Sequence, residues 1–300
     1  WKGLHRYAKE NGIQIIGDLP IYVAFDSADT WASPELFQFT TEHIPTAVAG
    51  CPPDAFSATG QLWGNPVYNW EYHRQTDFDW WIRRIQNSLK WYDVIRIDHF
   101  RGFDEFYAVP YGNPTAENGS WQKGPGMDLF RAVWERLGKV AIIAEDLGYL
   151  TDSVKALLKE TGFPGMKVLQ FAFDSRDFSD YLPHTYPKNC VVYTGTHDND
   201  TTKGWFLSTR KYCRDFAREY MHKKELDADM LSWDFIALAM GSVAELCMIP
   251  IQDYLCMGSE ARVNAPATLG DNWIWRLRPG SLEDGLADQI REMTKLYGRI

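Results

Sequence analysis

The chain has 300 residues, of which 45% are apolar and 24% charged, with a formal net charge of -9. This composition excludes global disorder and supplies enough apolar residues for one large domain or two ordinary ones. The acidic balance argues against nucleic acid as a partner, and no apolar run approaches the roughly 18 residues that a membrane-spanning helix needs.

The N-terminal segment 1–11 (WKGLHRYAKEN) has the apolar spacing of an amphipathic helix, not the basic-then-apolar order of a signal peptide. The five cysteines are scattered along the chain and form no CxxC pair. They therefore indicate neither a zinc site nor a disulfide framework. We expect a cytoplasmic protein with reduced thiols.

Six short apolar runs recur along the chain and alternate with helical patterns such as 127–137 and 153–161. Continuous apolar runs are typical of strands buried on both faces of a parallel sheet, and alternation with helices predicts an α/β fold. The runs are 13–19 (IQIIGDL), 94–99 (VIRIDH), 140–146 (VAIIAED), 167–174 (KVLQFAFD), 190–198 (CVVYTGTHD) and 246–253 (LCMIPIQD).

Acidic residues lie at or near the carboxyl ends of five of these runs: Asp18, Asp98, Glu145, Asp198 and Asp253. Both (β/α)₈ barrels and doubly wound sheets build their sites at that end of the strands. The sequence lacks GxGxxG after a strand and lacks GxxxxGK[ST], which disfavours a nucleotide-binding fold. The long segments that interrupt the pattern, 20–93 and 174–189, are expected to be functional loops or a subdomain.

The run at 94–99 places Arg96 and Asp98 on one face of a strand, because side chains alternate along it. A cation next to a carboxylate favours the ionised form, which a nucleophile requires. An isolated RxD pattern on a strand is, however, more often a structural ion pair.

Two further segments carry chemistry. In VAIIAEDLG, Glu145 lies where the apolar run turns polar, so partial burial would suit it to general acid catalysis. The alternative is that Glu145 or, more readily, Asp146 caps the next helix. In VVYTGTHDNDT, His197 and Asp198 follow a strand, but HDND is weak evidence for a metal because paired histidines at metal spacing are missing. A structural role is the ordinary explanation of His197.

Together, three acids at the ends of three strands suggest carboxylate chemistry on a sugar. Glycoside chemistry needs two carboxyl groups flanking one bond, and a third acid can orient hydroxyls and stabilise positive charge. Aromatic residues make up 15% of the chain, with 13 Trp and 15 Tyr. Trp and Tyr suit half-apolar ligands such as sugars, although a large core would explain the same excess.

These segments resemble the amylomaltase family, the 4-α-glucanotransferases of glycoside hydrolase family 77, which are related to the α-amylases. The resemblance covers nearly the whole chain and depends above all on IDHFRG, AEDLG and GTHDND in this order and spacing. It also includes GDLPIYVAFDSADTWA, PPDAFSATGQLWGNPVYNW and RVNAPAT followed by NWIWR. It implies retaining transfer of α-1,4-glucan segments from maltooligosaccharides to acceptors such as glucose, without a metal or organic cofactor.

The resemblance implies that Asp98 is the catalytic nucleophile, Glu145 the general acid/base and Asp198 the acid that stabilises the transition state. Retention then predicts roughly 5–5.5 Å between the carboxyl groups of Asp98 and Glu145. The remaining residues that it assigns to the substrate are Asp18, Tyr22, Asp54, Phe56, Trp63, Asn65, Arg96, His99, His197 and Asn264.

The segment at about 50–70 resembles the mobile loop that arches over the acceptor sites in this family. Its aromatic residues are expected to contact the glucan, whereas two other tryptophans lie in helical patterns and are expected in the core. The loop residues are Phe56, Trp63, Tyr68 and Trp70, and the helical ones are Trp134 and Trp233. The chain departs from the family at Ala55, Ala265 and Ala267, which affects the expected acceptor preference but not the reaction.

The resemblance also implies a (β/α)₈ barrel, of which the six runs supply six strands. We expect residues 1–300 to be the C-terminal part of that barrel, lacking its first two strands, with the insert 20–93 after the third. Two alternatives stay open: an α-amylase-like hydrolase, and an inactive glucan-binding fragment. Such a fragment would complete its barrel with the N-terminal part of the same protein.

Overall fold

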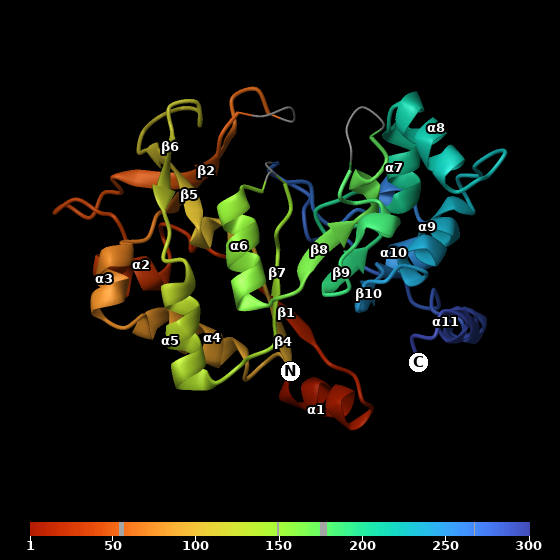
Figure 1. Ribbon diagram of the computed structural model, residues 1–300, viewed down its shortest axis with the longest axis horizontal. Helices are drawn as coiled ribbons and strands as arrows, with labels where there is room; N and C mark the ends of the chain where they lie inside the picture. The colour runs from red at the N-terminus through yellow and green to blue at the C-terminus, as the bar shows by residue number, and fades with distance from the viewer. Residues whose placement is uncertain (54–56, 149, 175–178, 267) are drawn as a thin grey trace. The chain divides into compact units, whose positions relative to one another are not determined.

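The computed structural model describes residues 1–53, 57–148, 150–174, 179–266 and 268–300. The chain divides into two compact units, Trp1–Gly165 and Met166–Ile300. Each unit has its own apolar core, and strands alternate with helices along both, so the fold is α/β as predicted (Figure 1).

The first unit contains a parallel sheet of order β1-β4-β7, built from β1 (Ile16–Leu19), β4 (Val94–Ile97) and β7 (Ile142–Ala144). Gly17 pairs with Ile95, and Ile95 pairs with Ile142. Ile95, Ile97 and Ala144 are fully buried. Three of the predicted runs are thus confirmed as strands. Each strand is shorter than its run: residues 13–15 precede β1, residues 98–99 follow β4, and residues 140–141 and 145–146 flank β7.

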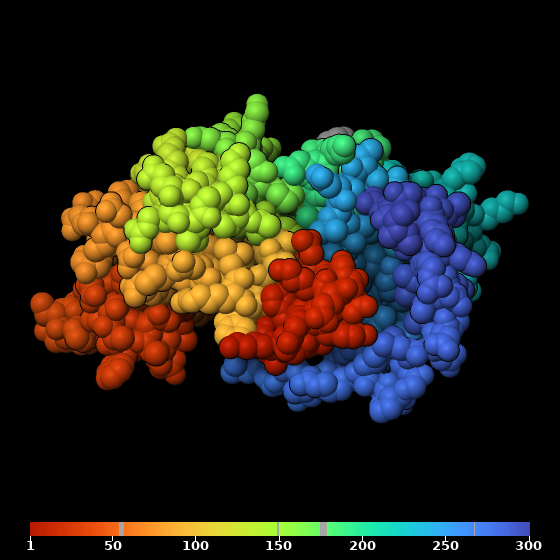
Figure 2. Space-filling model, turned by 90° about the horizontal axis from the view of Figure 1, so that it is seen from below, coloured from red at the N-terminus to blue at the C-terminus, as the bar shows by residue number. Residues whose placement is uncertain are grey.

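Helices of the first unit follow the predicted pattern closely. The segments 1–11, 127–137 and 153–161 correspond to α1, α5 and α6, in that order. The α-helices are α1 (Lys2–Glu10), α2 (Ala28–Ala32), α3 (Trp70–Gln75), α4 (Asp79–Ser88), α5 (Met127–Leu137) and α6 (Asp152–Thr161), and the 3₁₀ helices are η1 (Pro34–Leu36) and η2 (Phe100–Phe103). Figure 2 shows α1, in red, at the surface, and Ala8 is its one buried residue.

The proposed helix cap at Asp146 is wrong. Helix α6 begins after Thr151, whose hydroxyl accepts the N–H of Val154, and the left-handed Gly162 ends it. Asp146 is buried instead, and its carboxyl group packs so tightly on Gly165 that an added Cβ would lie 2.6 Å away.

A second, antiparallel sheet of the first unit has the order β3-β2-β5-β6. Its strands are β2 (Ala47–Cys51), β3 (Gln61–Pro66), β5 (Glu105–Pro110) and β6 (Ser120–Lys123). The long segment 20–93 supplies β2 and β3, while β5 and β6 come from the chain after β4.

Two aromatic residues that were expected to contact glucan are part of the core instead. Tyr68 is 1% exposed and Trp70 is 5% exposed. The Tyr68 ring stacks on Phe37 at 5.3 Å, and its hydroxyl donates to the Ile21 carbonyl at 2.7 Å. Because neither ring is accessible, that expectation is wrong for Tyr68 and Trp70, and they account for part of the aromatic excess as core.

The second unit has a three-stranded sheet of order β10-β9-β8. Its strands are β8 (Gly165–Val168), which starts at the last residue of the first unit, β9 (Cys190–Tyr193) and β10 (Leu246–Met248). Strands β9 and β10 run parallel, with Cys247 paired to Val192. Two predicted runs differ from the structure. Only residues 167–168 of the run 167–174 lie in β8, and residues 169–171 form a 3₁₀ helix. The last run is too long, because Pro250 precedes a short helix, α10 (Ile251–Tyr254), which carries Asp253.

Helices pack the second unit around Phe173 and Phe235, whose rings are 5.3 Å apart. Trp233 is half-buried against Tyr254, and in the first unit Trp134 is half-buried against the core, so both contribute to packing. The remaining helices are α7 (Thr202–Ser208), α8 (Lys211–Tyr220), α9 (Leu231–Met240), α11 (Asp284–Leu296), η3 (Leu169–Phe171), η4 (Pro183–Thr185) and η5 (Ser259–Ala261). Within the described parts of the chain, no helix has the length and apolar character to cross a bilayer.

Candidate active site

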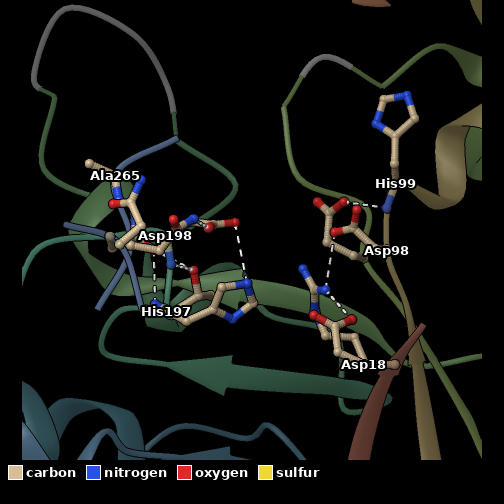
Figure 3. A network of polar contacts seen from close by, with 12 residues as sticks. Asp18, Asp98, His99, His197, Asp198 and Ala265 are labelled. Atoms are coloured by element: carbon tan, nitrogen blue, oxygen red, sulfur yellow. Dashed lines mark hydrogen bonds and ion pairs between the residues drawn. The ribbon is translucent and has the colours of Figure 1, made fainter. Parts of the chain in front are cut away.

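Arg96 joins two carboxylates at the ends of β1 and β4. Its Nη1 lies 2.6 Å from Asp18 Oδ1 and 3.1 Å from Asp98 Oδ1 (Figure 3). Asp18 stands opposite Arg96 in the parallel register, while strand alternation brings Asp98 to the same side. The predicted residues Asp18 and Asp98 therefore contact the same cation. The RxD pattern indicates the contact with Asp98 but not the one with Asp18.

Burial distinguishes the cation from its partners. The Arg96 side chain is 7% exposed, whereas those of Asp18 and Asp98 are 41% and 39% exposed. Burial opposes the charge on Arg96, but attraction to Asp18, Asp98 and Glu145 outweighs it and raises the Arg96 pKa. The result is a fixed positive charge beneath two carboxylates that are open to solvent.

Glu145 follows β7 directly and is held by backbone groups on both sides. Its Oε2 accepts the N–H of His99 and its Oε1 accepts the N–H of Leu147, both at 2.8 Å. Its own N–H donates to the Ile97 carbonyl at 3.0 Å, and its carbonyl accepts the N–H of Phe100 at 2.9 Å. The main chain and the carboxyl group of Glu145 are thus both held by hydrogen bonds to backbone groups.

The pKa of Glu145 is raised to about 7. Burial is the largest cause and the negative charge of Asp98 adds to it, while Arg96 and the two backbone donors act in the opposite direction. Each oxygen accepts one backbone hydrogen bond and keeps a second lone pair, so a proton can be carried there. A carboxyl group with this pKa suits general acid and base catalysis near neutral pH.

His99 turns the chain out of β4. Its backbone is in the left-handed region, with φ 50° and ψ 52°, which is uncommon outside glycine and tends to occur at functional sites. Its ring meets the Trp63 indole edge-on at 4.8 Å. Burial, with the charge of Arg101 adding to it, lowers the His99 pKa to about 4, so the imidazole is neutral at physiological pH.

Three predicted substrate residues of the segment 20–93 lie on or next to β3, whose Trp63 contacts His99. The Tyr22 ring is 6.2 Å from Trp63, and the Trp63 indole N–H donates to Gln61 at 3.1 Å. The Asn65 amide donates to the Val23 carbonyl at 2.9 Å, which ties β3 to the chain after β1. Two more predicted substrate residues, Asp54 and Phe56, lie outside the described residues, as does Ala55.

Asp198 lies in the loop after β9 of the second unit, and two of the predicted residues touch it. Its Oδ1 accepts the Asn264 amide at 2.6 Å, and its Oδ2 is 3.5 Å from Nε2 of His197 (Figure 3). Asn264 is 66 positions away in sequence, so only the fold brings the two together.

Sequence reasoning missed two residues next to Asp198. The Arg262 guanidinium donates to the Asp198 carbonyl at 2.8 Å, and the Trp273 ring lies 5.3 Å from that of His197. Both belong to the quoted strings RVNAPAT and NWIWR, which were the available signal. In the same region, the N–H of Ala265 donates to Asn272 at 2.9 Å, whereas Ala267 lies outside the described residues.

Over the described ranges of both units, no group of three or more His, Cys, Asp or Glu side chains is arranged to hold a metal ion. The chemistry that these residues can perform by themselves is proton transfer at Glu145 and nucleophilic attack by Asp98.

Known proteins match this chain along its whole length. A family profile described as 4-alpha-glucanotransferase matches residues 1–283. The 4-alpha-glucanotransferase of Clostridium butyricum is 51% identical over 301 residues, covering 100% of this chain and 61% of that protein. That of Synechocystis sp. is 49% identical over 302 residues, covering 100% of this chain and 59% of that protein.

A solved structure matches equally well. The amylomaltase from Streptococcus agalactiae in complex with acarbose has a TM-score of 0.94 at 43% identity, covering 99% of this chain and 60% of that one. The chain thus spans about 60% of the length of the curated relatives it matches. A match over residues 1–283 includes all three strand-end motifs, and the chain therefore belongs to the 4-alpha-glucanotransferase family, glycoside hydrolase family 77.

Proposed function

We propose that this chain carries the catalytic carboxylates of a 4-α-glucanotransferase that transfers α-1,4-glucan segments with retention of configuration. The observation that supports it most directly is the pair at the ends of β4 and β7. Asp98 is held by the buried cation of Arg96, and Glu145 beside it has a pKa raised to about 7. One carboxylate is thus suited to attack and the other to carrying a proton, as double displacement requires.

In the first step, an Asp98 oxygen attacks the anomeric carbon and the bond to the leaving glycosidic oxygen breaks. Glu145 gives its proton to that oxygen, which leaves as a sugar 4-hydroxyl. In the second step, Glu145 takes the proton from an incoming 4-hydroxyl, whose oxygen displaces Asp98. Two displacements at one carbon restore the original configuration.

Asp198 is the third carboxylate of the proposal and would stabilise positive charge at the anomeric carbon. The contacts of its Oδ1 with Asn264 and of its Oδ2 with His197 support a fixed orientation. Maltooligosaccharides are the proposed donors, and glucose is a proposed acceptor. The names of the curated relatives, and the acarbose complex of the Streptococcus agalactiae amylomaltase, support a glucan substrate.

We further propose that the two sheets supply six strands of a (β/α)₈ barrel whose first two strands come from an N-terminal part of the protein. Support comes from the parallel pairing of β1, β4 and β7, from that of β9 and β10, and from the greater length of the relatives. The acids Asp18, Asp98 and Glu145 would then lie at the end of the strands where barrel enzymes place their sites.

Incubation of the chain with maltotriose and glucose distinguishes the candidate activities. Longer maltooligosaccharides without a net gain of reducing ends indicate transfer. A net gain of reducing ends indicates an α-amylase-like hydrolase, and binding without any product indicates a glucan-binding chain. Chromatography of the products together with a reducing-end assay measures all three.

Asp98→Asn tests the nucleophile. The amide cannot form the glycosyl ester, so disproportionation of maltotriose should fall below detection. Asp79→Asn is the matched control, because it makes the same chemical change at an exposed ion pair with Arg83 on α4. Transfer at the wild-type rate by Asp98→Asn would refute the assignment.

A further inference from the structure

Asp253 is the strand-end acid to which the proposed reaction gives no role. It lies on α10 and is 1% exposed. Its Oδ2 accepts the hydroxyl of Thr194 at 2.5 Å and that of Thr202 at 2.8 Å, and its Oδ1 accepts the Thr202 N–H at 2.8 Å. Buried polar groups are normally hydrogen-bonded, and the carboxyl group of Asp253 accepts three such bonds although the proposed reaction does not use it.

The donors mark the two ends of one loop. Thr194 follows the last residue of β9, and Thr202 is the first residue of α7, so the residues 195–201 between them carry His197 and Asp198. Both threonines are fully buried. A single side chain on α10 therefore fixes the entry and the exit of the loop that carries Asp198.

Further contacts hold the middle of the same loop. The Gln170 amide donates to the Asp200 carbonyl at 2.8 Å, and the Ser259 hydroxyl donates to Asp200 Oδ2 at 2.6 Å. Arg262 and Asn264 hold Asp198 itself. Except for Gln170, these side chains come from the stretch 252–264, which begins beside Asp253.

Burying the carboxyl group of Asp253 costs free energy that an apolar side chain at this position would not cost. Burial raises the Asp253 pKa, which means that the ionised form is disfavoured, and the three donors offset only part of that effect. Apolar residues in place of buried charges are often neutral or stabilising. A carboxylate at this position therefore makes more sense as a means of holding a particular loop geometry than as a contribution to stability.

We propose that Asp253 is a positioning residue that sets the geometry of Asp198 by pinning Thr194 and Thr202 at the two ends of the loop. The inference rests on the proposed function of Asp198 in glucan transfer.

Paired substitutions at Thr202 separate hydrogen bonding from packing. Thr202→Val keeps the shape but loses the hydroxyl, whereas Thr202→Ser keeps the hydroxyl and loses a methyl group. We expect Thr202→Val and Asp253→Asn to lower kcat about 100-fold with little change in KM, because a displacement of about 1 Å in a catalytic group costs that much. Thr202→Ser should keep wild-type kcat. So should the control Asp234→Asn on α9, which removes an ion pair with Lys223.

Hydrogen exchange provides a readout that does not depend on activity. In Thr202→Val and Asp253→Asn, amides of 195–202 should exchange at least about tenfold faster, while those of β9 and α9 keep their protection. Unchanged protection of the loop, or wild-type kcat in both variants, would overturn the inference. So would a loss of protection throughout the second unit, which would mean that Asp253 serves folding alone. If neither the wild-type chain nor its N-terminally extended form transfers glucan, the proposed function fails, and the exchange measurement still decides whether Asp253 pins the loop.

Discussion

The adjacent acids Glu145 and Asp146 follow the same strand but have different surroundings. Glu145 keeps two backbone donors and has a pKa raised to about 7. Asp146 is buried, and its carboxyl group packs against Gly165. The local sequence places both acids at the end of a strand. Only the residues packed around them distinguish Glu145, the candidate proton donor, from Asp146, which packs against Gly165.

The Glu145 pKa predicts a pH dependence. Glu145 must be protonated for the first step, so kcat/KM should fall as the pH rises through about 7 and the proton is lost. Glu145→Gln should lower transfer by at least about 100-fold and abolish this alkaline decline.

Maltosyl fluoride sharpens the same test, because fluoride leaves without a proton. Glu145→Gln should therefore form the glycosyl intermediate from this donor much faster than from maltotriose. Glu105→Gln, at an exposed pair with Lys123 on β5 and β6, is the control and should behave as wild type. An alkaline decline that persists in Glu145→Gln would assign the titration to another group.

The strand β1 depends on a glycine for its packing. Gly17 pairs with Ile95, and an added Cβ there would lie 2.1 Å from the Tyr92 ring. The nearest atoms include Cγ, at the base of the ring, at 2.2 Å, so the Tyr92 side chain or the strand would have to shift. A side chain at this position, one residue before Asp18, would therefore be overpacked.

Gly17→Ala should destabilise the protein by about 2 kcal/mol, because overpacking displaces the Tyr92 ring or the strand. Gly3→Ala is the matched control: nothing lies within 4 Å of an added Cβ in helix α1, so the change should stabilise by about 0.5 kcal/mol. Urea unfolding of both variants measures the difference. Equal stability of Gly17→Ala and wild type would show that β1 relaxes freely.

The strands and helices were predictable to different degrees. Five of the six predicted apolar runs contain a strand, because apolar residues buried on both faces leave a clear local pattern. The run 167–174 shares only its first two residues with β8 and continues into η3. The antiparallel sheet was not predicted, since its strands β2 and β3 include glycine and proline and β2 pairs with β5 from another region of the chain. Helix α10 was read as strand because Ile249 and Ile251 continue the apolar run past Pro250.

The length of the chain relative to its relatives leads to one prediction for the molecule as a whole. If the six strands belong to an eight-stranded barrel, extending the chain at its N-terminus to the length of the Clostridium butyricum relative should raise the rate of maltotriose disproportionation. The same extension on the Asp98→Asn chain is the control and should show no transfer. Equal rates with and without the extension would contradict the barrel proposal.

Residue order alone was enough to identify the family and to locate Asp98, Glu145 and Asp198, because each lies in a short motif beside a buried strand. Alternation also placed Arg96 with Asp98, which is a property of any strand. Local patterns could not show that Tyr68 and Trp70 are core residues, since solvent exposure depends on what the rest of the chain covers.

The tertiary structure decided the contacts that join distant parts of the sequence. Asp18 reaches Arg96 across 78 positions, and Asp253 reaches Thr194 across 59. The raised Glu145 pKa belongs to the same class, because desolvation and the charge of Asp98 arise only when β4 and β7 pair. Short motifs specify which groups are present, whereas burial and charge proximity, which determine how those groups react, exist only in the folded chain.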